Sequence, residues 1–252
     1  TVNLNILQEL TMSLNQSEQK ILAARTAVET LVKNGLIFSG MKIGLGTGST
    51  ALPAVKRLAE YIADGTLKNI KAVATSFQTE NACIDWNVPV FSFKDRAIDG
   101  ELDLAIDGAD EIDLENNCIK GGGAALLREK IVAYNAKKFV IVADSSKAVK
   151  TLGTKFALPV EIIPEAYVPV KKALEKLGAK VALREGVRKC GPVITDNGNQ
   201  IVDCLWENSV DPARMEDLID GITGVVEVGF FTKNKPIAFI GKDDGTVEVR
   251  GL

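Results

Sequence analysis

Apolar residues follow two different spacings in the first part of the chain. Between Ser17, a predicted N-cap, and Asn34 they recur every three or four residues, as in a helix with one buried face, and Gly35 is the predicted C-cap. Continuous apolar runs such as "KFVIV" are typical of strands buried on both faces. These patterns predict helices at 17–34, 50–65, 77–86 and 123–136, and strands within 41–50, 69–76, 88–93, 102–110 and 138–146. Because strands and helices alternate, we expect an α/β fold, a Rossmann-like parallel sheet with helices on both faces.

A second pattern begins near Pro159. Strand, helix and strand are predicted over 159–185, two strands around the turn signal Asn197-Gly198, and a helix and strand over 212–231. This order predicts a smaller ferredoxin-like α+β domain. The strands of the tail are expected to return to the first sheet. We therefore predict two domains: a catalytic α/β domain with a phosphate-binding turn, residues 1–157 plus 236–252, and an α+β domain that makes oligomer contacts, residues 158–235.

The composition narrows the classes of function. With 252 residues, a net charge of −3 and no basic stripe, the chain is not expected to bind nucleic acid. No apolar run reaches the roughly 18–20 residues that span a bilayer, and the first residues do not resemble a secretory signal, so no membrane association is expected. The four cysteines are scattered without a CxxC pair, which favours a reducing compartment. We expect a cytoplasmic protein or, alternatively, one of the plastid stroma after removal of a transit peptide.

The chain has no histidine, so acid–base chemistry is left to carboxylates and lysines. Acidic residues concentrate in "DLAIDGADEIDLENN", residues 103–117. A calcium loop of the EF-hand type starting at Asp107 is excluded, because its third, fifth and sixth positions do not fit. Asp107 and Asp110 instead follow an apolar strand directly, at the carboxyl end where open α/β sheets bind ligands. The other acids are expected to stay on the surface: Glu111, Asp113 and Glu115.

A glycine-rich turn, "GLGTGSTA" at 44–51, lies between a predicted strand and a predicted helix. Backbone N–H groups and the helix dipole favour an anion at such a place. The glycines also fit a dinucleotide fingerprint, but the next strand ends in "ATS" without the acid that would hold a ribose. The hydroxyls of Thr47, Ser49 and Thr50 suit a phosphate monoester better. The alternative is a purely structural turn with a capping Ser or Thr.

Lys120 precedes three glycines, 121–123, that lead into a predicted helix carrying Glu129 on its third turn. Glycines allow the backbone to approach a ligand closely. Apolar neighbours on the helix suggest that Glu129 is partly buried, which would raise its pKa toward that of a general base. The alternative is an exposed Glu129 paired with Lys130 or Arg128.

Four motifs in this order, "GTGST", "DGADE", "KGGGAALLREK" and "ADSSK", closely resemble type A ribose-5-phosphate isomerase over nearly the whole chain. The resemblance implies the catalytic residues Asp107, Asp110, Lys120 and Glu129. It implies a substrate site made of Lys20, Gly46, Thr47, Gly48, Ser49, Thr50, Gly121, Gly122, Gly123 and Lys147. The segment "TSFQTE" departs from the Ser-rich version of the family, which leaves contacts from Thr75, Ser76 and Thr79 open. Without the resemblance, Lys147 would be interpreted as a solvated lysine in a loop.

The resemblance implies an aldose–ketose isomerase that interconverts D-ribose 5-phosphate and D-ribulose 5-phosphate through a cis-enediolate. Glu129 would be the base and Lys120 would stabilise the oxyanion, while Asp107 and Asp110 would move hydroxyl protons during ring opening. No cofactor and no metal are expected, and the partners are a sugar phosphate and further copies in a homodimer or homotetramer. The reaction would serve the non-oxidative pentose phosphate pathway or the Calvin cycle.

Three other functions would also use parts of this pattern. A sugar-phosphate sensor usually carries a DNA-binding module, but the residues before the first predicted strand form one helix with a polar leader. A nicotinamide-dependent oxidoreductase is disfavoured by the missing ribose-binding acid. A related sugar-phosphate isomerase or deaminase is the closest rival, and the spacing from Lys120 to Glu129 favours the pentose enzyme.

Overall fold

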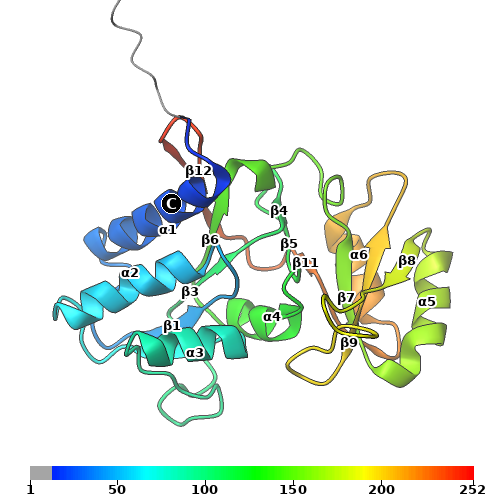
Figure 1. Ribbon diagram of the computed structural model, residues 1–252, viewed down its shortest axis with the longest axis horizontal. Helices are drawn as coiled ribbons and strands as arrows, with labels where there is room; N and C mark the ends of the chain where they lie inside the picture. The colour runs from blue at the N-terminus through cyan, green and yellow to red at the C-terminus, as the bar shows by residue number, and fades with distance from the viewer. Residues whose placement is uncertain (1–12) are drawn as a thin grey trace, which may run out of the picture.

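The computed structural model describes residues 13–252, which form three sheets of six, four and three strands (Figure 1). The large sheet has six strands in the order β13-β12-β6-β3-β1-β2. Their bounds are β1 (Lys42–Leu45), β2 (Lys71–Ala74), β3 (Leu104–Gly108), β6 (Phe139–Asp144), β12 (Ile237–Gly241) and β13 (Val247–Arg250). All neighbours are parallel except the edge strand β13. The carboxyl ends of β1, β3 and β6 therefore meet at one edge of the sheet, as predicted for the ligand-binding edge.

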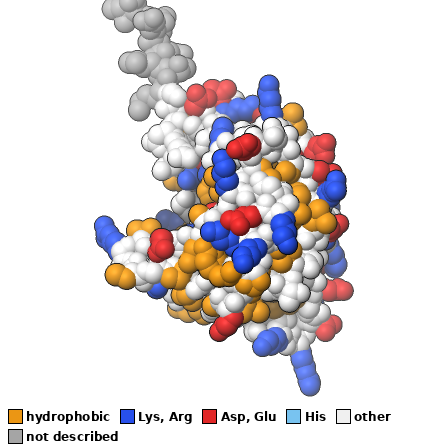
Figure 2. Space-filling model, turned by 90° about the vertical axis from the view of Figure 1, so that its right-hand side faces the viewer, with side chains coloured by type: hydrophobic (Ala, Val, Ile, Leu, Met, Phe, Trp, Pro, Cys, Tyr) orange, Lys and Arg blue, Asp and Glu red, His pale blue; other side chains and the backbone are white. Residues whose placement is uncertain are grey.

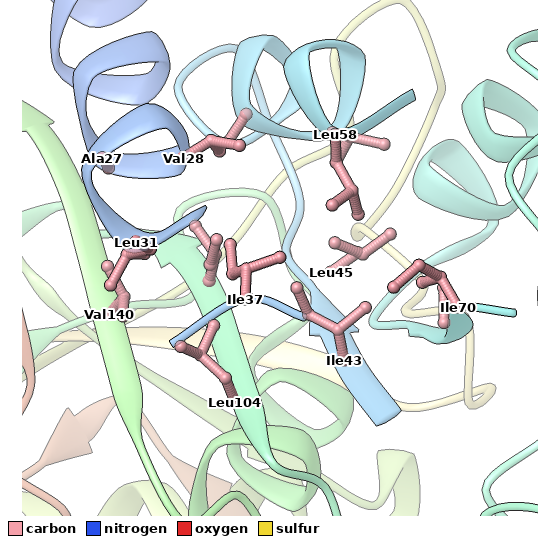
Figure 3. Close-up of a cluster of buried hydrophobic side chains, with 14 of the residues drawn as sticks. Ala27, Val28, Leu31, Ile37, Ile43, Leu45, Leu58, Ile70, Leu104 and Val140 are labelled. Atoms are coloured by element: carbon pink, nitrogen blue, oxygen red, sulfur yellow. The ribbon is translucent and has the colours of Figure 1, made fainter. Parts of the chain in front are cut away.

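Helices cover both faces of this sheet. Three helices, α1 (Gln16–Lys33), α2 (Leu52–Ala63) and α3 (Phe77–Asp85), enclose one core with the sheet, and α4 (Leu126–Tyr134) packs on the opposite face. Figure 3 shows the first core, which combines Leu31 of α1 and Leu58 of α2 with strand residues such as Ile43. Successive side chains of β6 alternate between the two cores, with Val140 in the first and Ile141 in the second. This alternation explains why the strand is apolar at every position from Phe139 to Ala143.

The smaller sheet lies beside the large one, on the right of Figure 1. Its strands are β7 (Leu158–Ile162), β8 (Lys180–Leu183), β9 (Gln200–Leu205) and β10 (Val225–Val228), with α5 (Tyr167–Lys176) and α6 (Pro212–Asp220) as crossover helices. All pairs are antiparallel, in the order β10-β7-β9-β8. This first-beside-third, split βαβ order is ferredoxin-like and confirms the predicted fold class.

A third, three-stranded sheet lies between these two layers (Figure 1). It consists of β4 (Glu111–Ile112), β5 (Cys118–Ile119) and β11 (Phe230–Phe231), and two short 3-10 helices, η1 (Ser145–Lys147) and η2 (Pro164–Ala166), complete the elements. Strands β12 and β13 return to the large sheet, as expected for the tail. The division of the chain into 1–157 plus 236–252 and 158–235 stays a prediction, and its first twelve residues lie outside the described part.

Several element bounds differ from the sequence prediction. Helix α1 is capped by Asn15 rather than Ser17, because the Asn15 side chain accepts from two backbone N–H groups and Glu18 completes a capping box. Its C-cap is Asn34, and Gly35 follows with a positive φ of 69°. The strand predicted at 88–93 is reduced to one bridge from Val90 to Ala72. Pro89 beside it has no N–H for a ladder.

Two further differences concern the segment before Asn197 and the start of α4. The turn at Asn197-Gly198 forms, but the segment before it makes two isolated bridges, Pro192 to Glu185 and Ile194 to Gln200, rather than a strand. Helix α4 begins at Leu126, so Glu129 lies in its first turn and not its third. The glycines before it form a turn in which Gly121 has a φ of 102°. Within residues 13–252, no helix is long and apolar enough to cross a membrane.

Candidate active site

A cavity of about 210 Å³ opens at the carboxyl edge of the large sheet. The turn after β1, the end of β3, the glycine turn before α4 and two lysines from α1 and η1 line it. The lining residues are Lys20, Thr47, Gly48, Ser49, Thr50, Gly108, Ala109, Asp110, Lys120, Gly121, Gly122, Gly123, Glu129 and Lys147. Of the residues predicted for the site, only Gly46 and Asp107 lie behind this lining. The motifs, far apart in sequence, therefore come together in one place.

Asp107, on β3, is buried and uses both of its carboxylate oxygens. Its Oδ1 accepts hydrogen bonds from the N–H of Thr47 at 3.1 Å and from its neighbour Gly108 at 2.7 Å, and its Oδ2 lies 3.0 Å from Nζ of Lys120. A Cβ on Gly46 would clash with this carboxylate, which explains the glycine at that position. Burial raises the pKa of Asp107, while the Lys120 charge opposes the rise. Asp107 thus ties the turn after β1 to Lys120.

Lys120 follows β5 and is buried among acceptors. Its Nζ donates to the carbonyl of Gly108 at 2.5 Å and forms ion pairs with Asp107 at 3.0 Å and Glu129 at 3.3 Å. Burial by itself lowers the pKa of the ammonium, but the neighbouring carboxylates of Asp107 and Glu129 outweigh it and raise that pKa. Lys120 is therefore a fixed positive charge at the wall of the cavity.

Glu129 lines the cavity with only 4% of its surface exposed. Its Oε2 atom accepts no hydrogen bond from the residues that the structure describes, although Lys120 is its ionic neighbour. Burial raises the pKa of this carboxyl, against the lowering effect of Lys120. The exposed alternative, a pair with Lys130 or Arg128, is wrong. The first turn of α4 places this side chain beside buried Lys120.

Asp110 is half-buried and lines the cavity from the loop after β3. Its Oδ2 accepts from the N–H of Gly122 at 2.7 Å, and a Cβ on Gly122 would clash with the same carboxylate. The carbonyls of Gly121 and Gly122 accept from Arg184, which follows β8, at 2.9 and 3.1 Å. Arg184 also pairs with Asp203 on β9. The small sheet therefore holds the glycine turn in place. Arg184 and Gly122 are 62 residues apart in sequence, so no local signal predicts this contact.

The other end of the cavity is rich in cations and donors. Lys20 of α1 donates to Oγ of Ser49 at 3.2 Å, and Lys147 of η1 lines the same cavity. Helix α2 starts just after this turn, with Ala51 at its N-cap, a side chain that cannot accept from the first N–H groups. Such a helix start beside two lysines suits an anion.

Three hydroxyl residues support the turn from behind and do not belong to the lining. The Thr47 hydroxyl lies 2.7 Å from those of Thr75 and Ser76, and Thr79 donates to the carbonyl of Gly46 at 2.8 Å. Gln78 accepts from the N–H of Gly48 at 3.0 Å. The segment "TSFQTE" therefore fixes the shape of the glycine-rich turn.

Two acids expected on the surface are buried, and that expectation is wrong for them. Glu111 accepts from the backbone N–H groups of Gly153, Lys155 and Phe156, and Asp113 accepts from Asn117. Both carboxylates close loops. The donors to Glu111 come from a distant segment, which the sequence does not reveal, whereas the donors to Asp113 are its near neighbours Glu115 and Asn117. Glu115 is exposed, as expected. No group of three or more Asp, Glu or Cys side chains in residues 13–252 is arranged to hold a metal ion.

Comparisons of the sequence point to one family. A family model described as ribose 5-phosphate isomerase A (phosphoriboisomerase A) matches residues 71–245. A protein of Treponema denticola named ribose-5-phosphate isomerase A is 57% identical over 237 residues, which cover 93% of this chain and 99% of that protein. A protein of the same name from Treponema pallidum is 51% identical over 239 residues, covering 94% of each.

Solved structures agree with the sequence matches. A D-ribose-5-phosphate isomerase in complex with phospho-erythronic acid has a TM-score of 0.87 and 39% identity, covering 95% of this chain and all of that one. A ribose 5-phosphate isomerase A from Methanocaldococcus jannaschii has a TM-score of 0.84 and 40% identity, covering 93% and 98%. The extent of these matches, together with four motifs that meet at one cavity, shows that the chain belongs to the ribose 5-phosphate isomerase A family.

Proposed function

We propose that this chain interconverts D-ribose 5-phosphate and D-ribulose 5-phosphate through a cis-enediolate, with Glu129 as the base. The observation that carries the proposal is the Glu129 carboxylate, buried at the cavity wall beside the Lys120 ammonium. Moving the carbonyl group from C1 to C2 requires one proton to pass from C2 to C1 and a second proton to pass from the C2 hydroxyl to O1. A single carboxylate that reaches both carbons can carry the first of these protons.

The raised pKa of Glu129 suits this role. A carboxylate with an ordinary pKa near 4.3 is a weak base at neutral pH, and burial brings its pKa closer to the working pH. The start of α4 places the charged form near the positive end of the helix dipole, which keeps the base form accessible.

Lys120 is placed to stabilise the enediolate oxygen. A fixed donor of this kind is worth about 3–4 kcal/mol of transition-state stabilisation. We propose that Asp107 acts on Lys120 and on the Thr47 turn rather than on the sugar, because both of its oxygens are engaged behind the lining. Asp110 does line the cavity, and we propose that it moves the proton between O1 and the ring oxygen when the furanose opens.

The phosphate of the substrate fits the other end of the cavity, at Ser49, Thr50 and the two lysines. Binding energy from this remote group holds the reacting carbons at the base. The related isomerase bound to phospho-erythronic acid supports a ligand of this class, a phosphate ester that carries an acid group. That compound joins a phosphate to a planar carboxylate, and a planar carboxylate resembles an enediolate in shape and charge.

The test is turnover of ribose 5-phosphate by the purified, EDTA-treated chain, followed as ribulose 5-phosphate formed. D-Ribose without a phosphate is the matched control substrate. We expect rapid turnover of the phosphate ester after EDTA treatment and at least a thousandfold lower kcat/KM for free ribose, since binding of the phosphate contributes several kcal/mol. Binding of ribose 5-phosphate without turnover would contradict the proposal and favour a sensor.

We also propose that the chain forms a homodimer or homotetramer through the small sheet. Large apolar side chains are exposed in this part of the chain, among them Ile163, Val168 and Leu205. Figure 2 shows the end of the molecule that this sheet forms, where hydrophobic side chains lie among charges of both signs. A monomer mass in light scattering would contradict this assembly. The pathway served and the location, cytoplasm or plastid, stay predictions from the sequence.

A further inference from the structure

Lys130, the residue after Glu129 on α4, is buried and contacts the small sheet. Its Nζ donates hydrogen bonds to Oε1 of Glu227 at 2.7 Å and to the carbonyl of Val228 at 2.7 Å. It also donates to Oε1 of Glu216 at 3.3 Å. Glu227 and Val228 belong to β10, and Glu216 to α6. Lys130 therefore fastens the helix that carries Glu129 to the small sheet.

Glu216 is fully buried and collects donors from two directions. Tyr134, four residues after Lys130 on α4, donates its hydroxyl to Oε1 at 2.7 Å. Thr232 donates both its backbone N–H, at 3.1 Å, and its hydroxyl to Oε2. Residues four apart lie on one face of a helix, so a single carboxylate holds α4 at two points along that face. Such a contact sets both the rotation of α4 about its axis and its position along it.

The ring of Phe231 on β11 lies close to the ammonium groups of both Lys130 and Lys120. Its centroid is 4.9 Å from Nζ of Lys130 and 5.6 Å from Nζ of Lys120, distances at which a cation is attracted to an aromatic face. Tyr134 packs against the same ring edge to face, with centroids 5.8 Å apart. The cluster around Glu216 is therefore connected to Glu129 by helix α4 and to Lys120 by the Phe231 ring.

Stability alone does not account for a buried ion pair at this place. Removing two charges from water is costly, and well-packed apolar side chains of similar volume are often as stable. Apolar contacts slide and rotate more easily than a directed ion pair with defined hydrogen bonds. Catalysis depends steeply on geometry, since a misplacement of about 1 Å can cost roughly a hundredfold in rate.

We propose that Lys130 and Glu216 are positioning residues of the isomerisation. Their buried ion pair holds α4 so that the Glu129 carboxylate reaches the substrate carbons. This inference rests on the proposed role of Glu129 as the base. Neighbouring residues of a helix point about 100° apart, so Lys130 can face the small sheet while Glu129 faces the cavity. The small sheet thus takes part in catalysis without touching the substrate.

The test replaces the pair by uncharged side chains, Lys130→Met together with Glu216→Gln. Met keeps most of the length of the Lys side chain, and Gln keeps a carbonyl oxygen for the Thr232 donors. We expect kcat for ribose 5-phosphate to fall about tenfold or more while KM changes less than threefold, because the base is displaced and the phosphate anchor is not. An unchanged kcat would overturn the inference. Tyr134→Phe, a milder change that removes one donor to Glu216, should shift kcat in the same direction, and an unchanged kcat there would count against it equally.

A second measurement separates positioning from general loosening. In a Glu129→Gln background the paired replacement should lower the residual kcat by less than about twofold, because its effect passes through a base that is no longer there. An equal loss with and without Glu129 would overturn the inference. Leu174→Ala, in the core behind α5, is the control for lost stability and should leave kcat unchanged. A comparable loss of kcat in that control would also overturn it.

The proposed function and this inference fail in different ways. An inactive parent, or a Glu129→Gln variant as active as the parent, overturns the proposed function and the inference with it. An active parent with an inactive Glu129→Gln variant and a fully active paired replacement overturns the inference alone.

Discussion

Oε2 of Glu129 lies 3.3 Å from Nζ of Lys120, and within residues 13–252 no donor satisfies it with a hydrogen bond. A buried oxygen that is near a cation but not bonded to a donor keeps a lone pair for a proton from the substrate. The neighbouring ammonium is then placed to meet the negative charge that proton removal creates. This pair of residues therefore supplies the base that removes the proton and the cation that stabilises the resulting negative charge.

The pH dependence of the reaction should report the raised pKa of Glu129. A base acts only when deprotonated, so kcat/KM falls as the pH drops below this pKa, and we expect the acid limb well above the ordinary Glu value of about 4.3. The Asp110 charge contributes to the rise, so Asp110→Asn should move the limb of the residual activity to lower pH. A pH profile of kcat/KM with its acid limb at the ordinary Glu value would contradict this account.

Lys120→Met should destabilise the fold as well as abolish activity. It leaves Asp107 and Glu129 buried without a cation, which costs about 3–5 kcal/mol at neutral pH. Both carboxylates take up protons more readily in the folded variant than in its unfolded chain, so the loss should shrink as the pH falls toward 5.

Urea unfolding at two pH values measures this effect. Lys137→Met is the matched control, because Lys137 also lies 3.0 Å from a carboxylate, that of Asp103, but its side chain is 68% exposed. This control should cost less than about 1 kcal/mol. Equal losses in the free energy of unfolding for the two variants would show that the burial of Lys120 and its carboxylates does not determine the cost.

The fold and most of the site could be predicted from sequence because their signals are local. The apolar runs at 104–106 and 139–143 and the glycine-rich turns each lie within one short segment. Contacts between distant segments leave no such signal in the sequence. Examples are the hydrogen bonds from Arg184 to the glycine turn, those from the loop at 153–156 to Glu111, and the ion pair of Lys130 with Glu216. The start of α4 was also missed, since Gly121 to Gly123 can either enter a helix or form a turn.

Lys20→Ala should weaken the phosphate end of the site. Lys20 donates to Ser49 at the cavity lining, and loss of one charged hydrogen bond to a phosphate should lower kcat/KM about tenfold, mainly through KM. The defect should shrink at high salt, where the phosphate attraction is screened for the parent as well. Lys33→Ala, at the far end of the same helix, is the control and should behave as the parent. A drop in kcat at constant KM would contradict the assignment.

Gly122→Ala should disturb Asp110 selectively. The added Cβ would collide with the Asp110 carboxylate, whereas the Cβ in Gly123→Ala would meet only the methyl of Thr47 at 3.8 Å. We therefore expect Gly122→Ala to lower kcat/KM by at least tenfold and Gly123→Ala to have a clearly smaller effect, as for a misplaced catalytic group. Steady-state kinetics of the two variants measure this difference. A larger loss of kcat/KM in Gly123→Ala than in Gly122→Ala would contradict the proposal that Asp110 acts on the sugar.

The most direct test of the base is Glu129→Gln, compared with the parent in turnover and in calorimetric binding of ribose 5-phosphate. Gln keeps the shape of the side chain but cannot take a proton. The account predicts that kcat falls by about a thousandfold or more, as for loss of a general base, while the dissociation constant changes less than tenfold. A variant that keeps kcat within tenfold of the parent would contradict the account and place the base elsewhere.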